Sequence, residues 1–459
     1  MSTDGASPAS LGRGRPGDKI ALFGGTPVVS RGSHRLWPIV GEEERRAVAR
    51  VLDRGILSGP YAPESRALEE EFARFAGARH CLLTHCGTSA LLVALAASGV
   101  RAGDEVIVPA YSFVATPLAV VHTGAVPVFA DVDVATGCLD PAAAEAAVTP
   151  HTRAIMPVHM HGCAADMGRL IEVARRHELA LVEDAAQAHG ATTLGRPVGA
   201  IGAAGGFSMQ SSKNLSAGEG GLFVTDDDAI AAEAACVRNF GQNVSRGDED
   251  DYDLSRPLDG TRALDSRRIG SMYRGSEMMA AFARAQLAAL PERTARCQRN
   301  ADRLTRALAA LPGVAPPLVP AGRTSVHHKF RVHLDPALAG VALPPIRWRD
   351  TVMAALRAEG LEVVLWQTAP LPAQGVFRHG DPSGGFPHAR EGGADLAMNY
   401  DAARYPRTQA LLDGSVVLFS QSCPLIAQPD DLVDRYVEAF RRVWQRREEL
   451  AEWAARSAS

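Results

Sequence analysis

One lysine stands out as a group that could do chemistry. Lys213 closes a Gly-flanked run that contains the apolar residues Phe207 and Met209, and a Gly-Glu-Gly-Gly turn at 218–221 comes shortly after it. Burial of an ammonium without a partner is costly, so it lowers the pKa of a lysine and suits an amine that must attack a carbonyl. Taken alone, the stretch fits a surface lysine on a polar loop equally well.

Two more stretches carry groups that would complement such an amine. Gly87, Thr88 and Ser89 follow an apolar run and open a helical segment, where free N–H groups and the helix dipole can hold a phosphate. The same residues could simply cap that helix. Asp184 ends another apolar run, the position where open α/β sheets place ligands, and it too could be a helix cap.

Together, these groups predict a pyridoxal 5′-phosphate site. The cofactor needs an amine for its aldehyde carbon, a carboxylate for its pyridine nitrogen and a cradle for its phosphate. Lys213, Asp184 and the turn at 87–89 provide that set. Phe113 follows a predicted strand and could stack on the ring, although ordinary core packing would also explain it.

The elements that must position these groups alternate between strands and helices. Short apolar runs predict the strands, and segments with helical spacing lie between them. The predicted strands are 81–84, 105–108, 126–129, 153–158, 179–183, 206–209 and 222–225, with helices at 89–97, 114–122, 142–148 and 167–177. This order predicts an α/β fold with a mostly parallel sheet covered on both faces.

The pattern changes along the chain and predicts three parts. Residues 1–19 are expected to form a flexible tail, and residues 20–285 a large cofactor-binding domain. A polar insertion at 244–268 is either a solvated loop or a segment that reaches a partner subunit. Residues 286–459 are expected to form a smaller α+β domain with strands at 329–334, 363–366 and 416–419.

Composition excludes several classes of protein. The 459 residues are 46% apolar and carry a net charge of -4, so no nucleic-acid footprint is evident. There is no apolar run long enough for a membrane span and no secretory signal. Seven scattered cysteines argue against a disulfide framework and favour the cytoplasm. His159, His161 and Cys163 lack a second ligand cluster, so no metal is expected.

Five motifs in order make the chain resemble the sugar and cyclitol aminotransferases of the DegT/DnrJ/StrS family. The motifs lie at 87–91, 108–116, 157–162, 183–191 and 207–213, the last followed by the Gly-rich turn at 218–221. The resemblance runs from about 23 to 447 and implies the type I aminotransferase fold, a pyridoxal phosphate cofactor and a homodimer with active sites at its two-fold interface.

The resemblance implies a role for each candidate site residue. Lys213 would be the Schiff-base lysine and the proton shuttle, and Asp184 would bind the pyridine nitrogen. Gln187 would lie near the ring hydroxyl, and Phe113 would stack on the ring. The groups expected at the phosphate belong to Gly87, Thr88, the Ser89 backbone and Ser208.

The chain also departs from the family pattern. Cys86 stands where Ser or Asn is usual, and Met272 stands where the family commonly has an Asn that reaches the phosphate of the neighbouring subunit. A thioether cannot make that hydrogen bond well. Tyr273 and Arg274, in the same motif, are candidate substrate-binding residues. The dehydratase branch has His at the lysine position, so Lys213 argues against that chemistry.

The implied activity moves an amine from L-glutamine or L-glutamate to a ketone in a ping-pong cycle. The stretches 209–213 and 366–372 resemble the cyclitol branch, which aminates inosose-type ketones with glutamine, as in aminocyclitol antibiotic biosynthesis. The acceptor could instead be a nucleotide-linked keto-sugar, whose diphosphate would need cations such as Arg274. Two further functions stay compatible with the motifs. One is an aromatising lyase or synthase similar to the amino-hydroxybenzoate branch, and the second is non-catalytic cofactor binding.

Overall fold

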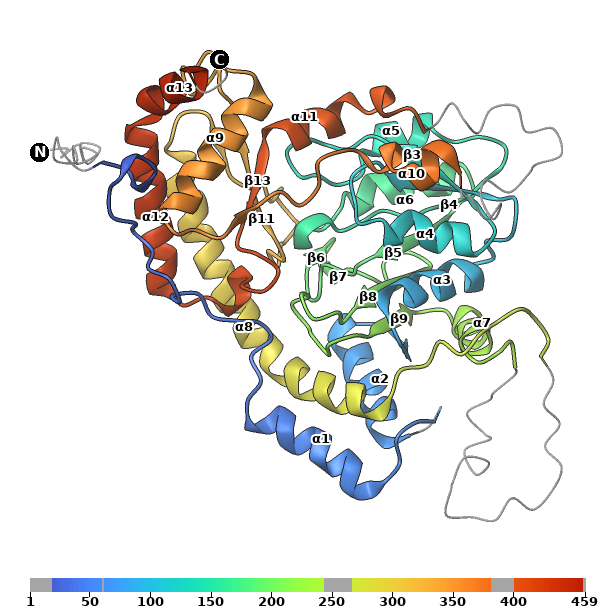
Figure 1. Ribbon diagram of the computed structural model, residues 1–459. Coiled ribbons are helices and arrows are strands. Elements are labelled where there is room, and N and C mark those ends of the chain that lie inside the picture. The colour runs from blue at the N-terminus through green and yellow to red at the C-terminus, as the bar shows by residue number, and fades with distance from the viewer. Residues whose placement is uncertain (1–18, 60–61, 243–265, 381–399, 457–459) are drawn as a thin grey trace, which may run out of the picture.

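A seven-stranded sheet forms the centre of the larger lobe (Figure 1). The computed structural model describes residues 19–59, 62–242, 266–380 and 400–456. The strand order is β1-β9-β8-β5-β4-β2-β3, and β9 is antiparallel to both its neighbours whereas the other pairs are parallel. This confirms the mostly parallel α/β sheet predicted from the sequence. The strands are β1 His80–Thr84, β2 Glu105–Pro109, β3 Val126–Ala130, β4 Thr152–Ile155, β5 Ala180–Asp184, β8 Ala204–Ser208 and β9 Gly221–Thr225.

Burial on both faces explains why these strands are continuous apolar runs. Every residue of β2, β3, β8 and β9 is buried, as expected for a parallel sheet covered on both sides. The helices of this lobe are α2 Pro63–Ala76, α3 Gly87–Ala97, α4 Ala115–His122, α5 Pro141–Ala146, α6 Met167–Arg176 and α7 Asp228–Arg238, and a small hairpin joins β6 Thr192–Thr193 to β7 Arg196–Pro197. The predicted helices therefore exist close to their predicted bounds.

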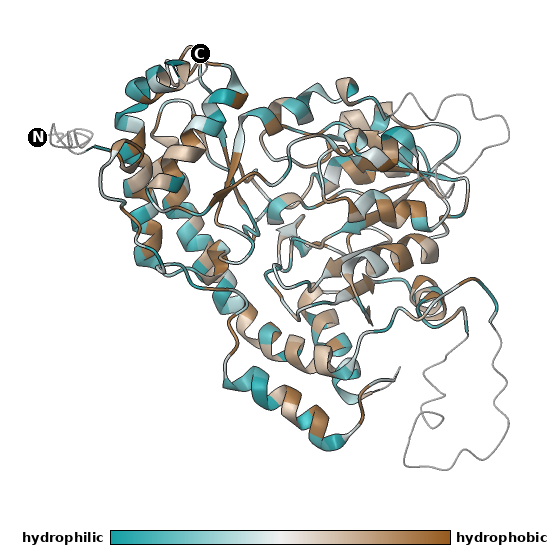
Figure 2. Ribbon diagram, viewed as in Figure 1, coloured by the Kyte–Doolittle hydropathy of each residue, from teal (hydrophilic) through white to brown (hydrophobic). Residues whose placement is uncertain are grey.

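A four-stranded antiparallel sheet marks the smaller lobe. Its order is β10-β11-β13-β12, and its helices alternate hydrophilic and hydrophobic residues, as amphipathic helices do (Figure 2). Trp348 and Trp444 pack edge to face in its core, with ring centroids 5.7 Å apart. The elements are β10 Val314–Ala315, β11 Phe330–Leu334, β12 Val363–Val364, β13 Ser415–Leu418, α9 Pro345–Ala358, α12 Asp430–Gln445 and α13 Arg447–Arg456.

The 33-residue helix α8 (Glu277–Ala309) connects the two lobes and also packs on α1 (Glu42–Arg54) (Figure 1). Further along, the chain returns to the large lobe through α10 (Gly375–His379) and α11 (Pro406–Gly414). There Phe377 packs against Phe129, with ring centroids 5.2 Å apart. The predicted domain boundary at residue 285 lies inside α8, and the chain crosses between the lobes more than once, so this boundary stays a prediction. Single 3-10 turns lie at Ala21–Phe23, Met160–Gly162, Leu371–Ala373, Ala402–Arg404 and Leu425–Ala427.

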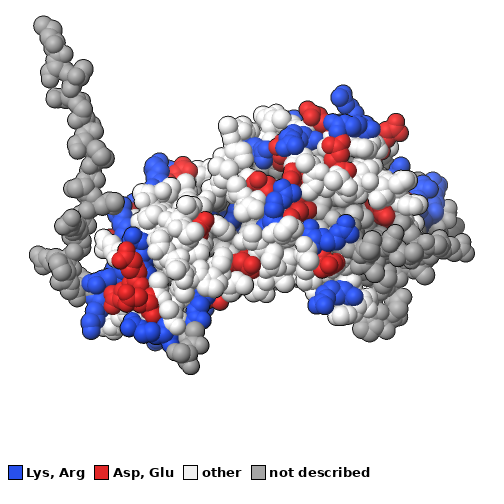
Figure 3. All heavy atoms as spheres, turned by 90° about the horizontal axis from the view of Figure 1, so that it is seen from above, with Lys and Arg blue, Asp and Glu red and all other residues white. Residues whose placement is uncertain are grey.

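Some predictions concern residues that the structure does not describe. The tail lies almost entirely outside the described residues, and so does 244–265 of the predicted insertion. Within the described part, every helix is too short or too polar to cross a bilayer. Acidic and basic side chains are interspersed over the face shown in Figure 3.

Candidate active site

The loops that follow the carboxyl ends of several strands meet around one cavity of about 370 Å³. This edge of the sheet is where open α/β folds place their ligands. The cavity brings together residues from β5, β8 and the loops after β1 and β2, although 100 residues or more separate some of them. Of the predicted site residues, its lining contains Gly87, Thr88, Phe113, Asp184, Gln187, Ser208 and Lys213.

Lys213 lies in the loop between β8 and β9. Its N–H donates to the carbonyl of Gln210 at 2.8 Å, and its own carbonyl accepts from Trp37 Nε1 at 2.9 Å, so the backbone of this loop is fixed at both positions. Burial lowers the pKa of Lys213 to about 8, and the Asp184 carboxylate offsets part of that shift. At pH 7 roughly a tenth of the amine is therefore uncharged and nucleophilic, far more than for an ordinary lysine.

The lowered pKa of Lys213 gives a prediction for cofactor capture. Because only the neutral amine attacks an aldehyde, the rate at which apoenzyme takes up the cofactor should rise with pH and level off above about 8. Absorbance at about 410–430 nm follows this reaction in a stopped-flow instrument. A rate that continues to rise up to about pH 10, as for an ordinary lysine, would contradict the prediction.

Asp184 ends β5 and points its carboxylate into the same cavity. Its oxygens accept hydrogen bonds from Thr116 Oγ1 at 2.7 Å and from the N–H of Ala186 at 3.1 Å. Burial raises the pKa of Asp184, and these two hydrogen bonds oppose the shift. The neighbouring Glu183 has a structural role instead. Its carboxylate accepts hydrogen bonds from the N–H groups of Gly199, Ile201 and Gly202 and fixes the loop that precedes β8.

The turn at 87–89 begins helix α3 directly against the end of β8. A Cβ atom on Gly87 would lie 2.6 Å from the Cβ of Ser208, so only glycine allows this approach. Cys86 caps the helix, since its Sγ accepts from the N–H of Ser89 at 3.4 Å. Gly87, Thr88 and Ser208 thus form a small-residue cradle at the positive end of a helix dipole, where phosphates bind.

Replacing Gly87 with alanine should weaken cofactor binding. The new Cβ must push α3 away from Ser208, so we expect cofactor affinity to fall at least about tenfold and stability to fall by about 1–3 kcal/mol. Equilibrium titration of apoenzyme and urea unfolding measure the two effects. Gly375→Ala is the matched control, because a Cβ there meets no atom within 4 Å; equal behaviour of the two variants would refute the cradle.

Phe113 and Gln187 lie at the cavity in different ways. Phe113 is 56% exposed, so its ring is not part of a packed core. Gln187 is buried, and its Oε1 accepts from the N–H of His161 at 3.0 Å. Both positions are compatible with contact to a ring in the cavity.

Three predicted residues do not line the cavity. The Ser89 hydroxyl lies 3.1 Å from His85 Nε2, and its N–H is used by the Cys86 cap. Tyr273 stacks on His85 with ring centroids 5.8 Å apart, and Arg274 is hydrogen-bonded to Asn239. The predicted substrate contact of Tyr273 and Arg274 is therefore not made in the described cavity of one chain and remains a prediction about a dimer.

The cavity also contains residues that the motifs do not single out as site residues. His328 and Lys329 come from the small lobe, just before β11, and Trp366 follows β12. Trp366 belongs to the stretch that resembles the cyclitol branch, and its ring packs against Tyr111 and His161 with centroids 5.2 and 5.0 Å away. Only the rarity of lysine in the chain could have pointed to Lys329.

The possible metal ligands have other partners. His159 Nε2 lies 3.0 Å from Glu183 and its Nδ1 accepts from the N–H of Ala165. His161 Nε2 lies 2.7 Å from the Tyr111 hydroxyl. In the described ranges, no group of three or more His, Cys, Asp and Glu side chains is arranged to hold a metal ion.

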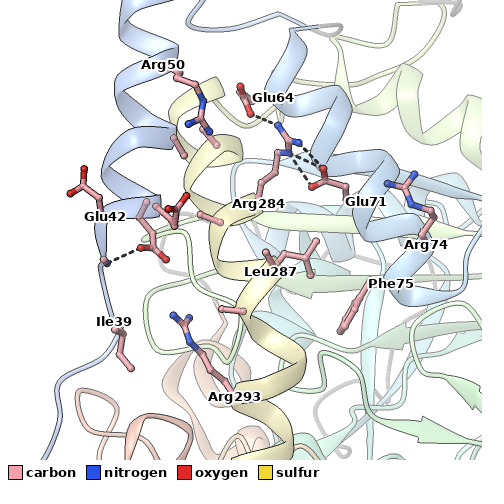
Figure 4. A pocket seen from close by; sticks show the side chains of 18 residues that line it. Ile39, Glu42, Arg50, Glu64, Glu71, Arg74, Phe75, Arg284, Leu287 and Arg293 are labelled. Carbon is pink, nitrogen blue, oxygen red and sulfur yellow. Dashed lines mark hydrogen bonds and ion pairs between the residues drawn. The ribbon is translucent and has the colours of Figure 1, made fainter.

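A larger hollow of about 850 Å³ lies between α1, α2 and α8 (Figure 4). Arg284 reaches across it to Glu64 and Glu71, at 2.5 and 2.6 Å. These charged side chains are paired with one another, and the described lining of this hollow holds neither lysine nor cysteine, serine or threonine. The cavity at Lys213 is therefore the candidate active site.

The residues present fit pyridoxal 5′-phosphate. Lys213 supplies an amine with a lowered pKa, and Asp184 supplies a buried carboxylate that still has room for a cationic partner. A Cβ on Gly87 would collide with Ser208, so the absence of a side chain there lets the start of α3 and Ser208 lie together at the cavity. An amine, a carboxylate and an anion cradle in one cavity are the donor set of this cofactor.

Known proteins are similar to this chain over most of its length. The model of the DegT/DnrJ/EryC1/StrS aminotransferase family matches residues 38–396. An L-glutamine:scyllo-inosose aminotransferase of Streptomyces griseus is 38% identical over 430 residues, which cover 92% of this chain and 97% of that protein. An L-glutamine:2-deoxy-scyllo-inosose aminotransferase of Micromonospora echinospora is 41% identical over 312 residues, which cover 66% of this chain and 72% of that protein.

Solved structures of related enzymes have the same fold. The structure of 3-amino-5-hydroxybenzoic acid synthase superposes with a TM-score of 0.74 at 31% identity and covers 92% of this chain and 99% of its own. That of DesI in the presence of its TDP-sugar product gives 0.75 at 32% identity, with 96% and 99% covered. The chain therefore belongs to the DegT/DnrJ/EryC1/StrS family and is a pyridoxal 5′-phosphate-dependent aminotransferase.

Proposed function

We propose that the chain transfers the amine of L-glutamine to the keto group of an inosose-type cyclitol. The observation that carries the proposal is the meeting of Lys213, Asp184 and the Gly87 cradle in one cavity, in a chain 38% identical to a glutamine:scyllo-inosose aminotransferase over nearly its whole length. The related structures named for a hydroxybenzoate product and a TDP-sugar are less similar, at 31% and 32% identity.

Each site residue then has a task. When bound, pyridoxal 5′-phosphate supplies an electron sink for the negative charge that develops at the donor Cα. Lys213 Nζ would hold the cofactor at rest and, once released, take the proton from that Cα. Asp184 would keep the pyridine nitrogen protonated, with Thr116 orienting its carboxylate at 2.7 Å. Thr88 and Ser208 would hold the phosphate, Phe113 would lie on the ring and Gln187 would lie near its hydroxyl.

The chemistry of the cavity also favours a cyclitol over a nucleotide-linked sugar as the acceptor. A nucleotide diphosphate needs several cations, and among the described residues of the lining there is no arginine. Polar groups such as those of Gln210, Ser212 and Gln421 are present instead and suit a polyhydroxylated ring. The assembly that we propose is a homodimer, in which Tyr273 and Arg274 would approach the site of the partner subunit.

The proposal is tested by incubating the enzyme and cofactor with L-glutamine and three separate acceptors. We expect an aminocyclitol from scyllo-inosose, and little product from a dTDP-linked keto-sugar or a cyclic keto-acid. Mass spectrometry identifies the products. Product only from the nucleotide sugar, or an aromatic product from the keto-acid, would replace the cyclitol assignment. Light scattering tests the dimer, which a fully active monomer would contradict.

A further inference from the structure

Lysine is rare in this chain, and its distribution is informative. Of the 48 lysine and arginine residues, only Lys19, Lys213 and Lys329 are lysines. Lys19 is exposed, whereas Lys213 and Lys329 line the same cavity. An arginine cannot lose its proton in a protein, but a buried lysine can. The candidate active site thus contains two of the three lysines, which are the basic residues that can gain and lose a proton.

Lys329 is a buried amine in the lining of the cavity. It is 4% exposed, and its Nζ has no hydrogen-bond partner among the residues that the structure describes. Burial and the nearby charge of Lys213 lower the pKa of Lys329 to about 8. Burial of an unpaired charge or donor is costly, so a position of this kind in a ligand cavity indicates that the ligand supplies the missing partner.

The described groups around Lys329 do not supply an anion. His328 and His161 have pKa values well below the usual range because of burial, so both are neutral. The Asp184 oxygens accept from Thr116 and from the N–H of Ala186, and Glu219, also at the cavity, is exposed. Lys213 is a second amine. In the described part of the cavity, Lys329 is therefore a basic group with no anionic partner, and an acidic ligand would provide one.

The two substrates of the proposed function differ in charge. Glutamine carries a carboxylate, which needs a cation when it enters a buried cavity. An inosose is neutral, and a permanent cation beside it would remain unpaired. We propose that Lys329 binds the donor carboxylate as an ammonium and faces the neutral cyclitol as an uncharged amine, so that one side chain serves both half-reactions. The proton would enter from solvent with the donor and leave with the oxo-acid product. This inference rests on the proposed function.

Proton uptake tests the inference without turnover. Glutaramate has the carbon chain, carboxylate and amide of glutamine but no amine, so it binds without reacting. Isothermal titration of the holoenzyme with glutaramate at about pH 9, in buffers of different ionisation enthalpy, should show close to one proton taken up per molecule bound, because Lys329 is mostly neutral there. In Lys329→Arg, binding should persist and the uptake should disappear. Uptake that persists in Lys329→Arg would overturn the proposal.

The separated half-reactions give the second test. In Lys329→Met, the Kd of L-glutamine should rise at least about 30-fold, while the reaction of the aminated cofactor with scyllo-inosose should change less than about threefold. Lys329→Arg should show the reverse preference, and Lys19→Met, at an exposed lysine, should change neither. Equal loss in both half-reactions, or loss of the cofactor itself, would overturn the proposal. If the wild-type enzyme does not transfer the amine of L-glutamine, that result contradicts the proposed function and leaves the role of Lys329 as a separate question.

Discussion

Replacement of Lys213 with alanine is expected to abolish amine transfer while the protein stays folded. The variant loses both the amine that holds the cofactor and the base that takes the Cα proton, so the rate should fall at least about 10⁴-fold. Part of the Lys213 surface faces the cavity, and its side chain makes no hydrogen bond that the structure records, so little stability should be lost. Single-turnover transfer from L-glutamine measures the rate, and circular dichroism reports the fold.

The control for this experiment is Lys19→Ala, which removes an exposed lysine far along the chain from the cavity. It should retain full activity. Reduction with borohydride should attach the cofactor covalently to the wild-type protein and to this control, and not to Lys213→Ala. Activity of Lys213→Ala within about tenfold of wild type would show that another group is the nucleophile.

Replacement of Asp184 with asparagine is expected to produce the second largest loss. The amide oxygen can still accept from the N–H of Ala186, which now donates at 3.1 Å, but the negative charge is removed. Without that charge the pyridine nitrogen is no longer held protonated, and amine transfer should slow by about 10³-fold. The variant should still bind the cofactor at Lys213, because the amine and the cradle are unchanged.

Stopped-flow absorbance separates these two effects, since it records cofactor attachment and its loss on addition of L-glutamine. Asp228→Asn, a carboxylate on the exposed start of α7 that pairs with Arg79 and His80, is the matched control and should transfer the amine normally. Wild-type rates in Asp184→Asn would mean that this carboxylate does not contact the cofactor nitrogen.

Local patterns were sufficient to predict the sheet and most of the candidate site. The site residues Asp184, Ser208 and Gly87 come directly after or at the ends of strands, and parallel strands bring their carboxyl ends to one edge. Once the strands are identified, the gathering of these residues follows from topology. The motif order then narrows the chemistry to a single cofactor.

The remainder of the site depends on contacts that no local pattern specifies. Lys329 and His328 reach the cavity only because β11 of the small lobe lies beside it, more than 100 residues after Lys213 in the chain. The cap at Cys86, which occupies the N–H of Ser89, depends on a side-chain rotation that a sequence does not show. Tyr273 and Arg274 belong to a motif that predicts a substrate contact, but in the structure they contact His85 and Asn239 and do not line the described cavity.

The absorption spectrum of the purified protein with its cofactor, before and after L-glutamine is added, tests the central claim most directly. We predict a band near about 410–430 nm that borohydride fixes onto Lys213 and that L-glutamine converts to the spectrum of the aminated cofactor. Subsequent addition of scyllo-inosose should restore the first band. A band that forms on Lys213 but does not respond to L-glutamine would contradict the account.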